Sequence, residues 1–246
     1  MIESNDIFSS KFWHKDEHKP KYNFESIENL EKPIKEILKQ LHDKINLGNY
    51  GLIIGDDASG RIPTLLVNKI ISTLYKERGL PVPKNLFFAG TGQLSSEIEK
   101  IQKQDKIAKI LHTFCKKHRA PKCAIIITDT IASGNSLVPL TCALKDNGIE
   151  YDIATVGLTQ FESKEKRKLY KKLGSEIVYG SDITPDIYGI YSISGVEKSI
   201  TDTFSRPYKQ GKNKHKQQNI QKNINLARED VALLSKELIC WYKDNF

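Results

Sequence analysis

The chain has 246 residues, of which 39% are hydrophobic and 28% charged, a balance that supports a folded core and argues against a disordered chain. It has no apolar run near the roughly 18 residues of a membrane span, and its polar start lacks a signal-peptide stretch, so we expect a soluble, cytoplasmic protein. The net charge of +8 fits nucleic acid, a small anionic substrate or a lysine-rich surface, and does not decide among them.

Strands and helices alternate along the middle of the chain. Residues 25–47 carry an apolar stripe at helical spacing, and Pro33 suggests that the helix starts nearer Leu30. Short apolar runs then predict strands, and amphipathic stretches predict helices. The predicted strands are 51–55, 85–92, 123–128, 151–158 and 176–180, and the predicted helices between them are 62–79, 95–118, 136–148 and 162–173. This order predicts an α/β fold with a doubly wound, mostly parallel sheet.

The chain changes character after Pro207. Residues 209–222 are basic but contain no aromatic residue for base stacking, so we interpret them as a solvated linker and not a nucleic-acid contact. Beyond them, apolar residues recur in steps of four and three, which predicts a helix that packs on the core or on a second subunit of a homodimer. The predicted parts are an N-terminal arm (1–24), an α/β domain (25–208), and the linker with a C-terminal helix (209–246).

The four cysteines signal neither a zinc site nor a redox pair, because none belongs to a C-x-x-C motif. Two of them lie in apolar runs, where a thiol behaves as a small buried hydrophobe. We therefore expect reduced, structural thiols at Cys115, Cys123, Cys142 and Cys240.

The strongest chemical pattern is AIIITDTIASGNSLVPL, residues 124–140, where a predicted strand passes into a helix. Asp129 is expected at the end of the strand, and Ser136 at the start of the helix. The amides of a tight glycine-containing loop and the start of a helix both attract anions, and Gly134 lets a ligand approach the backbone. Asp129 can accept hydrogen bonds from sugar hydroxyls, so this layout suits a ribose phosphate.

This segment resembles the phosphoribosyl pyrophosphate motif of type I phosphoribosyltransferases, from Thr128 to Ser136. The resemblance implies that Asp129 holds the ribose hydroxyls, with Thr128 beside it at the catalytic centre. It also implies that the 5′-phosphate lies against Ala132, Ser133, Gly134, Asn135 and Ser136. Thr128 stands where the family has the first of two acids, which alters half of the diol clamp and puts turnover in doubt more than binding.

A second segment, LIIGDDASGRIP at residues 52–63, resembles the pyrophosphate loop of adenine-type members of the same family. The resemblance implies contacts to pyrophosphate from Asp57, Ser59, Gly60 and Arg61. It also implies a Mg²⁺ held through Asp57 and Asp129, since carboxylates face pyrophosphate best across a hydrated metal ion.

The expected activity belongs to nucleotide metabolism: ribose 5-phosphate passes from phosphoribosyl pyrophosphate to a nitrogen acceptor resembling a nucleobase, and pyrophosphate leaves. Tyr188 and Tyr191 are candidates for stacking on the acceptor, or they cover the edge of the sheet. The family's mobile catalytic loop has no matching signature between residues 90 and 120. Two alternatives stay open: a regulatory protein that binds phosphoribosyl pyrophosphate or a nucleotide without turnover, and an unrelated doubly wound protein with a phosphate site.

Overall fold

The computed structural model describes residues 20–89, 96–118, 121, 123–159, 162–183, 191–197, 202–208 and 214–246, with the backbone alone considered at 191–192 and 214–217. The helices are α1 (Glu25–Glu28), α2 (Glu31–Gln40), α3 (His42–Asn46), α4 (Arg61–Glu77), α5 (Glu97–Lys117), α6 (Val138–Asp146), α7 (Ser163–Leu173), α8 (Tyr191–Ser194) and α9 (Lys214–Asn245), with a 3-10 turn η1 at Asn135–Leu137. The strands are β1 (Tyr50–Asp57), β2 (Lys84–Ala89), β3 (Cys123–Ile131), β4 (Glu150–Leu158), β5 (Ile177–Ser181), β6 (Val196–Glu197) and β7 (Arg206–Pro207).

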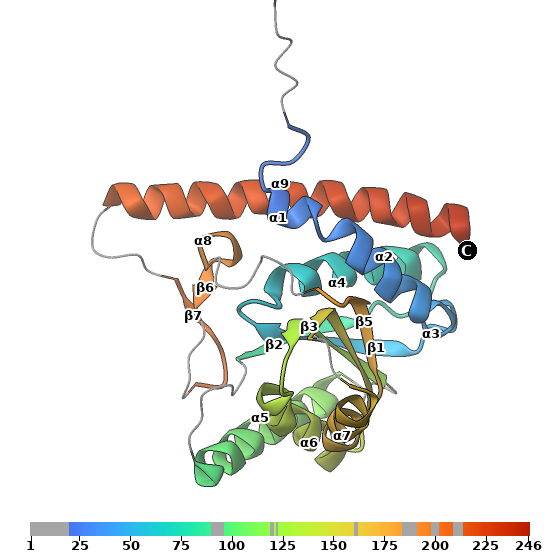
Figure 1. The fold of residues 1–246 in the computed structure, drawn as a ribbon, viewed down its shortest axis with the longest axis vertical. Coiled ribbons are helices and arrows are strands. Elements are labelled where there is room, and N and C mark those ends of the chain that lie inside the picture. The colour runs from blue at the N-terminus through green and yellow to red at the C-terminus, as the bar shows by residue number, and fades with distance from the viewer. Residues whose placement is uncertain are drawn as a thin grey trace, which may run out of the picture.

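Strands β1 to β5 form one all-parallel sheet in the order β2-β1-β3-β4-β5. Helices cover both faces, with α2, α4 and α9 on one side and α5, α6 and α7 on the other (Figure 1). The prediction of an α/β fold with a parallel sheet and an added C-terminal helix is therefore confirmed. The chain runs from β1 to β2 on one side and continues with β3 on the other, so the winding reverses between β1 and β3.

The core has two layers because successive side chains of a strand point to opposite faces of the sheet. Ile53 and Ile125 belong to the layer under α2, α4 and α9, whereas Leu52 and Ile126 belong to the layer under α5, α6 and α7. A sheet buried on both faces needs apolar residues at consecutive positions, which explains the unbroken apolar runs in β1 and β3. Each such side chain that is fully buried contributes about 1.5–3 kcal/mol to folding.

The start expected near Leu30 is confirmed, because α2 begins at Glu31, but the prediction of one helix over residues 25–47 is wrong, because the structure divides this segment into α1, α2 and α3. Pro33 lies in the first turn of α2 and has no amide hydrogen to donate to the carbonyl of Asn29, so α2 begins at Glu31 and does not continue α1. The apolar stripe itself is confirmed, since its residues are buried in the core from Ile27 to Ile45.

Two boundaries around the phosphate motif also differ from the prediction. Strand β3 continues to Ile131, which pairs with Leu158 of β4, so Asp129 lies within the strand and not at its end. Ser136 does not cap a helix, because it lies inside η1 and α6 begins only at Val138. Gly134 directly precedes η1 and has a left-handed backbone (φ 68°). The extra pairing with β4 is a tertiary contact, and no local pattern encodes it.

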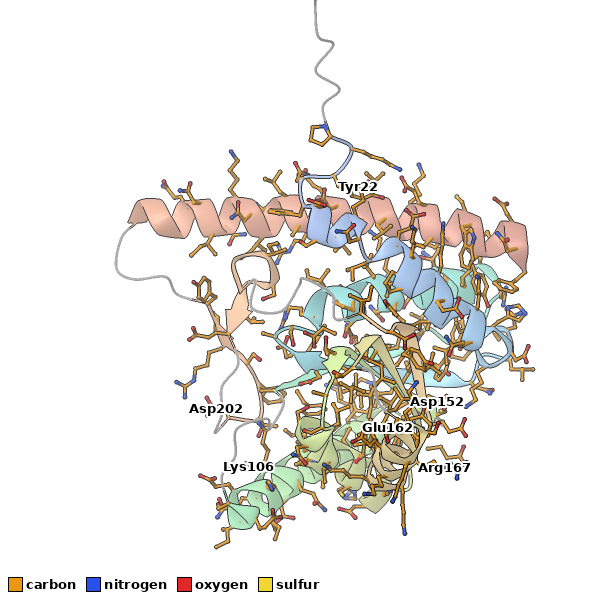
Figure 2. The ribbon with its side chains drawn as sticks, in the orientation of Figure 1. Tyr22, Lys106, Asp152, Glu162, Arg167 and Asp202 are labelled. Carbon is orange, nitrogen blue, oxygen red and sulfur yellow. The ribbon has the colours of Figure 1, made fainter. Side chains whose placement is uncertain are left out.

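Helix α9 packs on α4 and α8 of the same chain, and most of its apolar stripe is buried there. It also binds the segment before α1. The buried carboxylate of Asp230 accepts hydrogen bonds from the amides of Asn23 (3.1 Å) and Phe24 (2.8 Å). Figure 2 shows Tyr22 beside this helix, where its hydroxyl donates to Glu237 (2.8 Å). Residues 20–24, predicted to belong to an arm, are thus attached to the domain through α9.

All four cysteines are free, and burial raises the pKa of the Cys123 thiol to about 11. This agrees with the structural role expected for that thiol. Within the part of the chain that the structure describes, no helix is both long enough and apolar enough to cross a membrane.

Candidate functional site

The carboxyl ends of β1 and β3 lie next to each other at the point where the winding of the sheet reverses. Open parallel sheets of this kind bind ligands at that point, in the crevice between the two diverging connections. The turn after β1 spans residues 58–60 and the turn after β3 spans 132–134, and these are the two segments that the motifs single out. The fold therefore brings together two motifs that lie about 70 residues apart in the sequence.

The first turn lies against the backbone of β3, and Gly60 makes this approach possible. A Cβ atom at Gly60 would lie 2.5 Å from the carbonyl oxygen of Asp56 and 3.1 Å from the Cα of Thr128. The peptide bond between Asp57 and Ala58 is cis. The hydroxyl of Thr64 donates to the carbonyl of Gly60 (2.7 Å), which holds the turn at the start of α4. Gly60 is buried, so its main role in the structure is to let the turn and the strand touch.

A small network of carboxylates and hydroxyls lies under the two turns. Asp56, Asp57 and Asp129 are each at most 4% exposed. The hydroxyl of Ser59 donates to Oδ1 of Asp129 (2.9 Å). The hydroxyl of Thr128 lies 3.3 Å from both Oδ2 of Asp56 and Oδ1 of Asp129, and its single proton can serve only one of them at a time. Thr128 thus links the two strands at a position where an acid would add a further negative charge.

Asp129 brings a second carboxylate oxygen to this network. Oδ2 of Asp129 is buried and has no hydrogen-bond partner in the described part of the chain. An unpaired carboxylate oxygen in a protein interior costs about 1–3 kcal/mol, so it points to a ligand or a solvent molecule that completes it. Sugar hydroxyls and a divalent cation are both suitable partners for such an oxygen.

Arg61 neutralises the first turn from within the chain. Its Nε and Nη2 donate to the two oxygens of Asp57, both at 2.8 Å, and its guanidinium lies 4.5 Å from the centre of the Phe87 ring. A guanidinium has five N–H donors, so donors remain for an anion while the pair is intact. Asp57, in contrast, has both oxygens engaged, which makes it a poor metal ligand in this arrangement.

The residues present therefore fit the expected Mg²⁺ only in part: Asp129 can offer Oδ2, whereas Asp57 would first have to release Arg61. Among the residues that the structure describes, no group of three or more His, Cys, Asp or Glu side chains could hold a metal ion. Mg²⁺ usually takes one or two carboxylates and completes its shell with water and phosphate oxygens, so one carboxylate is compatible with a substrate-bound ion.

The second turn exposes its backbone on one side and rests on α7 on the other. Ala132, Ser133 and Asn135 are exposed, and Ser136 is half-buried. Gly134 is buried, and a Cβ there would lie 2.6 Å from Leu169 of α7. Among the described residues, the amides of Ser133 and Gly134 donate to no acceptor, while the amide of Asn135 donates weakly to the Ser133 hydroxyl (3.4 Å). Unused amides beside the start of a helix provide donors for an anion.

Lys172 is a residue of this site that sequence reasoning missed. It comes from the last turn of α7, and its ammonium donates to the carbonyl of Ser133 (2.9 Å) and to the side-chain oxygen of Asn135. It thus adds a positive charge to a turn that otherwise has only backbone dipoles. The sequence signals only a lysine-rich helix, and nothing in it marks Lys172 apart from its neighbours.

The acceptor side of the site is only partly described. Tyr188 lies outside the described residues, and for Tyr191 the structure gives only its place at the start of α8. The segment around Thr203 covers the carboxyl end of β2: its carbonyl accepts from the amide of Ala89 (2.9 Å), and Phe204 stacks on Phe88 (5.8 Å between ring centres). This segment therefore covers part of the sheet edge at β2.

No family model, no curated protein and no solved structure matches the chain.

Proposed function

We propose that this protein is a phosphoribosyltransferase with a type I phosphoribosyltransferase-like fold. In this proposal it moves ribose 5-phosphate from phosphoribosyl pyrophosphate to a nitrogen of a base-like acceptor. The observation that carries the proposal is the buried Oδ2 of Asp129, which has no hydrogen-bond partner among the described residues. On one side lies the turn whose Ser133 and Gly134 amides donate to no described acceptor, and on the other the turn followed by Arg61. A sugar with a phosphate on one side and a pyrophosphate on the other is complementary to these three features.

Each part of the site has a role in this reaction. The amides of Ser133 and Gly134, with Lys172, bind the 5′-phosphate, because charge-assisted hydrogen bonds to phosphate oxygens are short and strong. Asp129 accepts from the ribose hydroxyls. Ser59 and the unused donors of Arg61 face the pyrophosphate. Mg²⁺, when bound, neutralises negative charge on the pyrophosphate, and Asp129 is the carboxylate suited to hold it.

The reaction then needs little acid–base chemistry from the protein. The bond between C1 and the pyrophosphate oxygen breaks with its electron pair on oxygen, and a bond forms between C1 and the acceptor nitrogen, which loses a proton to solvent. Positive charge develops on the ribose ring as the leaving group departs. The carboxylates of Asp56 and Asp129 stabilise that charge in a site with little water, and the two turns fix the distance between phosphate and C1.

One observation favours a second candidate, a protein that binds phosphoribosyl pyrophosphate or a nucleotide without turning it over. At the position of the first of the family's two acids, Thr128 supplies a hydroxyl that lies within reach of both Asp56 and Asp129. Of the two adjacent carboxylates that would hold the ribose hydroxyls, only Asp129 is therefore present. Such a site can bind ribose, yet it stabilises the developing charge less.

Two measurements test the proposal. Calorimetry with ribose 5-phosphate, and with phosphoribosyl pyrophosphate and Mg²⁺, measures binding, and pyrophosphate release across a panel of nucleobases measures turnover. Asp129→Asn should weaken sugar binding by about tenfold or more, because it removes the charged acceptor. The exposed Asp105→Asn is the matched control and should bind like the wild type. Binding without release on any base would select the second candidate, and no binding at all would refute both.

A further inference from the structure

A cavity of about 960 Å³ lies between α4, α8 and α9, on the side of α4 that faces away from the sheet. In Figure 1, α4 lies between the sheet and α9, with α8 beside the first half of α9. Among the described residues, seven apolar side chains line the cavity: Ile62, Leu65, Val82, Ile193, Ile224, Ala227 and Val231. The lining runs along α4 from Arg61 to Glu77, a length of about 24 Å at the rise of an α-helix, so the space is elongated.

The rim of this cavity carries positive charge that nothing in the described chain neutralises. Lys69, Lys76 and Arg228 line the cavity, and none of them forms an ion pair with a described residue. The one acidic residue of the lining, Glu77, is already bound by Lys243 of α9 (2.6 Å). An apolar space edged by unpaired cations is complementary to an anion that has an apolar body.

We infer that this cavity is a second ligand site, which binds a small, elongated anion with an aliphatic body, such as an alkyl phosphate. Its volume lies at the upper end of the range of small-molecule sites, which is why a small ligand and not a folded partner is the occupant. The apolar residues bury the alkyl chain, and Lys69 with Arg228 pairs with the head group. Free amphiphiles and lipid head groups share this chemistry.

The site is distinct from the two turns at the carboxyl ends of β1 and β3, and the inference does not rest on the proposed function. The two share one residue, Arg61, which lines the cavity while it holds Asp57 and covers the ring of Phe87. Among the charged residues of the cavity, Lys69, Lys76 and Arg228 have no contact with the two turns in the described chain. Variants at these residues can therefore test the cavity while leaving ribose 5-phosphate binding unchanged.

Calorimetry with dodecyl phosphate, below the concentration at which it forms micelles, tests the inference. The wild type should bind one molecule saturably, and uncharged dodecyl maltoside should bind at least about tenfold more weakly if charge contributes to recognition. Lys69→Glu with Arg228→Glu should weaken dodecyl phosphate binding by at least about tenfold. Ser72→Trp, which fills the cavity, should abolish it. Lys106→Glu with Lys109→Glu on α5 makes the same change of charge in the opposite layer and should have no effect (Figure 2).

Circular dichroism and urea unfolding show whether each variant is folded. If Ser72→Trp is not folded, the charge reversal at Lys69 and Arg228 carries the test. Vesicles with and without phosphatidic acid separate the two sources, because co-sedimentation identifies a lipid and binding of the monomeric amphiphile alone identifies a free ligand. The inference is overturned if dodecyl phosphate does not saturate, if the maltoside binds equally well, or if the α4–α9 charge reversal and its α5 control bind alike.

Discussion

Replacing Gly60 by alanine tests whether the two turns of the site depend on a close approach of two backbones. A Cβ at Gly60 would lie 2.5 Å from the carbonyl oxygen of Asp56, about 0.9 Å closer than an ordinary contact, and 3.1 Å from both the carbonyl of Ile127 and the Cα of Thr128. All three neighbours are backbone atoms, so no side-chain rotation can relieve the overlap. Relief of the overlap therefore requires a movement of the backbone, in the first turn, in β3 or in both.

We expect Gly60→Ala to lower the free energy of unfolding by about 2–3 kcal/mol, the upper part of the range of about 1–3 kcal/mol typical of overpacking, because the overlapping atoms belong to the backbone. The shift also separates Ser59 from Asp129, so ribose 5-phosphate binding should weaken by about tenfold, equivalent to roughly 1.4 kcal/mol. Urea unfolding measures the first quantity and calorimetry the second.

Gly79→Ala is the control, because a Cβ atom at Gly79 would meet no atom of the described chain within 4 Å, and only the left-handed backbone there (φ 68°) opposes a side chain. It should cost about 1–2 kcal/mol in stability, from backbone strain alone, and leave ligand binding intact. If Gly60→Ala unfolds at the same urea concentration as the wild type and binds ribose 5-phosphate equally well, the two turns do not depend on that contact.

Three further results are expected. Lys172→Met should weaken ribose 5-phosphate binding by about threefold to tenfold in calorimetry at low salt; the effect is modest because solvent screens an exposed cation. Equal affinity of the variant and the wild type would show that Lys172 does not contact the phosphate. Asp230→Ala should lower the free energy of unfolding by about 2–4 kcal/mol, because it leaves the amides of Asn23 and Phe24 without their charged acceptor; a loss below about 0.5 kcal/mol in urea unfolding would contradict this. Burial raises the pKa of Tyr242 to about 12, so the contribution of its hydroxyl to stability is complete below about pH 10 and is lost as the pH rises towards 12. In alkaline unfolding, the free energy of unfolding should therefore fall less steeply with pH for Tyr242→Phe than for the wild type. Identical slopes would show that Tyr242 does not cause the alkaline loss.

Local patterns in the sequence were sufficient for the elements and for the class of fold. Alternating apolar runs and amphipathic stretches determine the five strands and the main helices, because each depends on a periodicity of 2 or 3.6 within one segment. The sequence by itself also determined which two turns carry the unusual residues, since Gly60, Asp129 and Gly134 stand out from their neighbours in composition. The boundaries were less accurate, as β3 shows: its last residues are held by pairing with β4, which lies 20–30 positions further on.

Only the tertiary structure decided what those residues touch. The order β2-β1-β3 brings Ser59 to Asp129 and leaves one carboxylate oxygen of Asp129 without a partner in the described chain, and no spacing rule contains that information. Lys172 reaches the second turn because α7 lies beside it, and α9 packs on α4 of the same chain. These contacts join segments tens of residues apart, and their geometry follows from how helices and strands pack together, which a one-dimensional pattern does not specify.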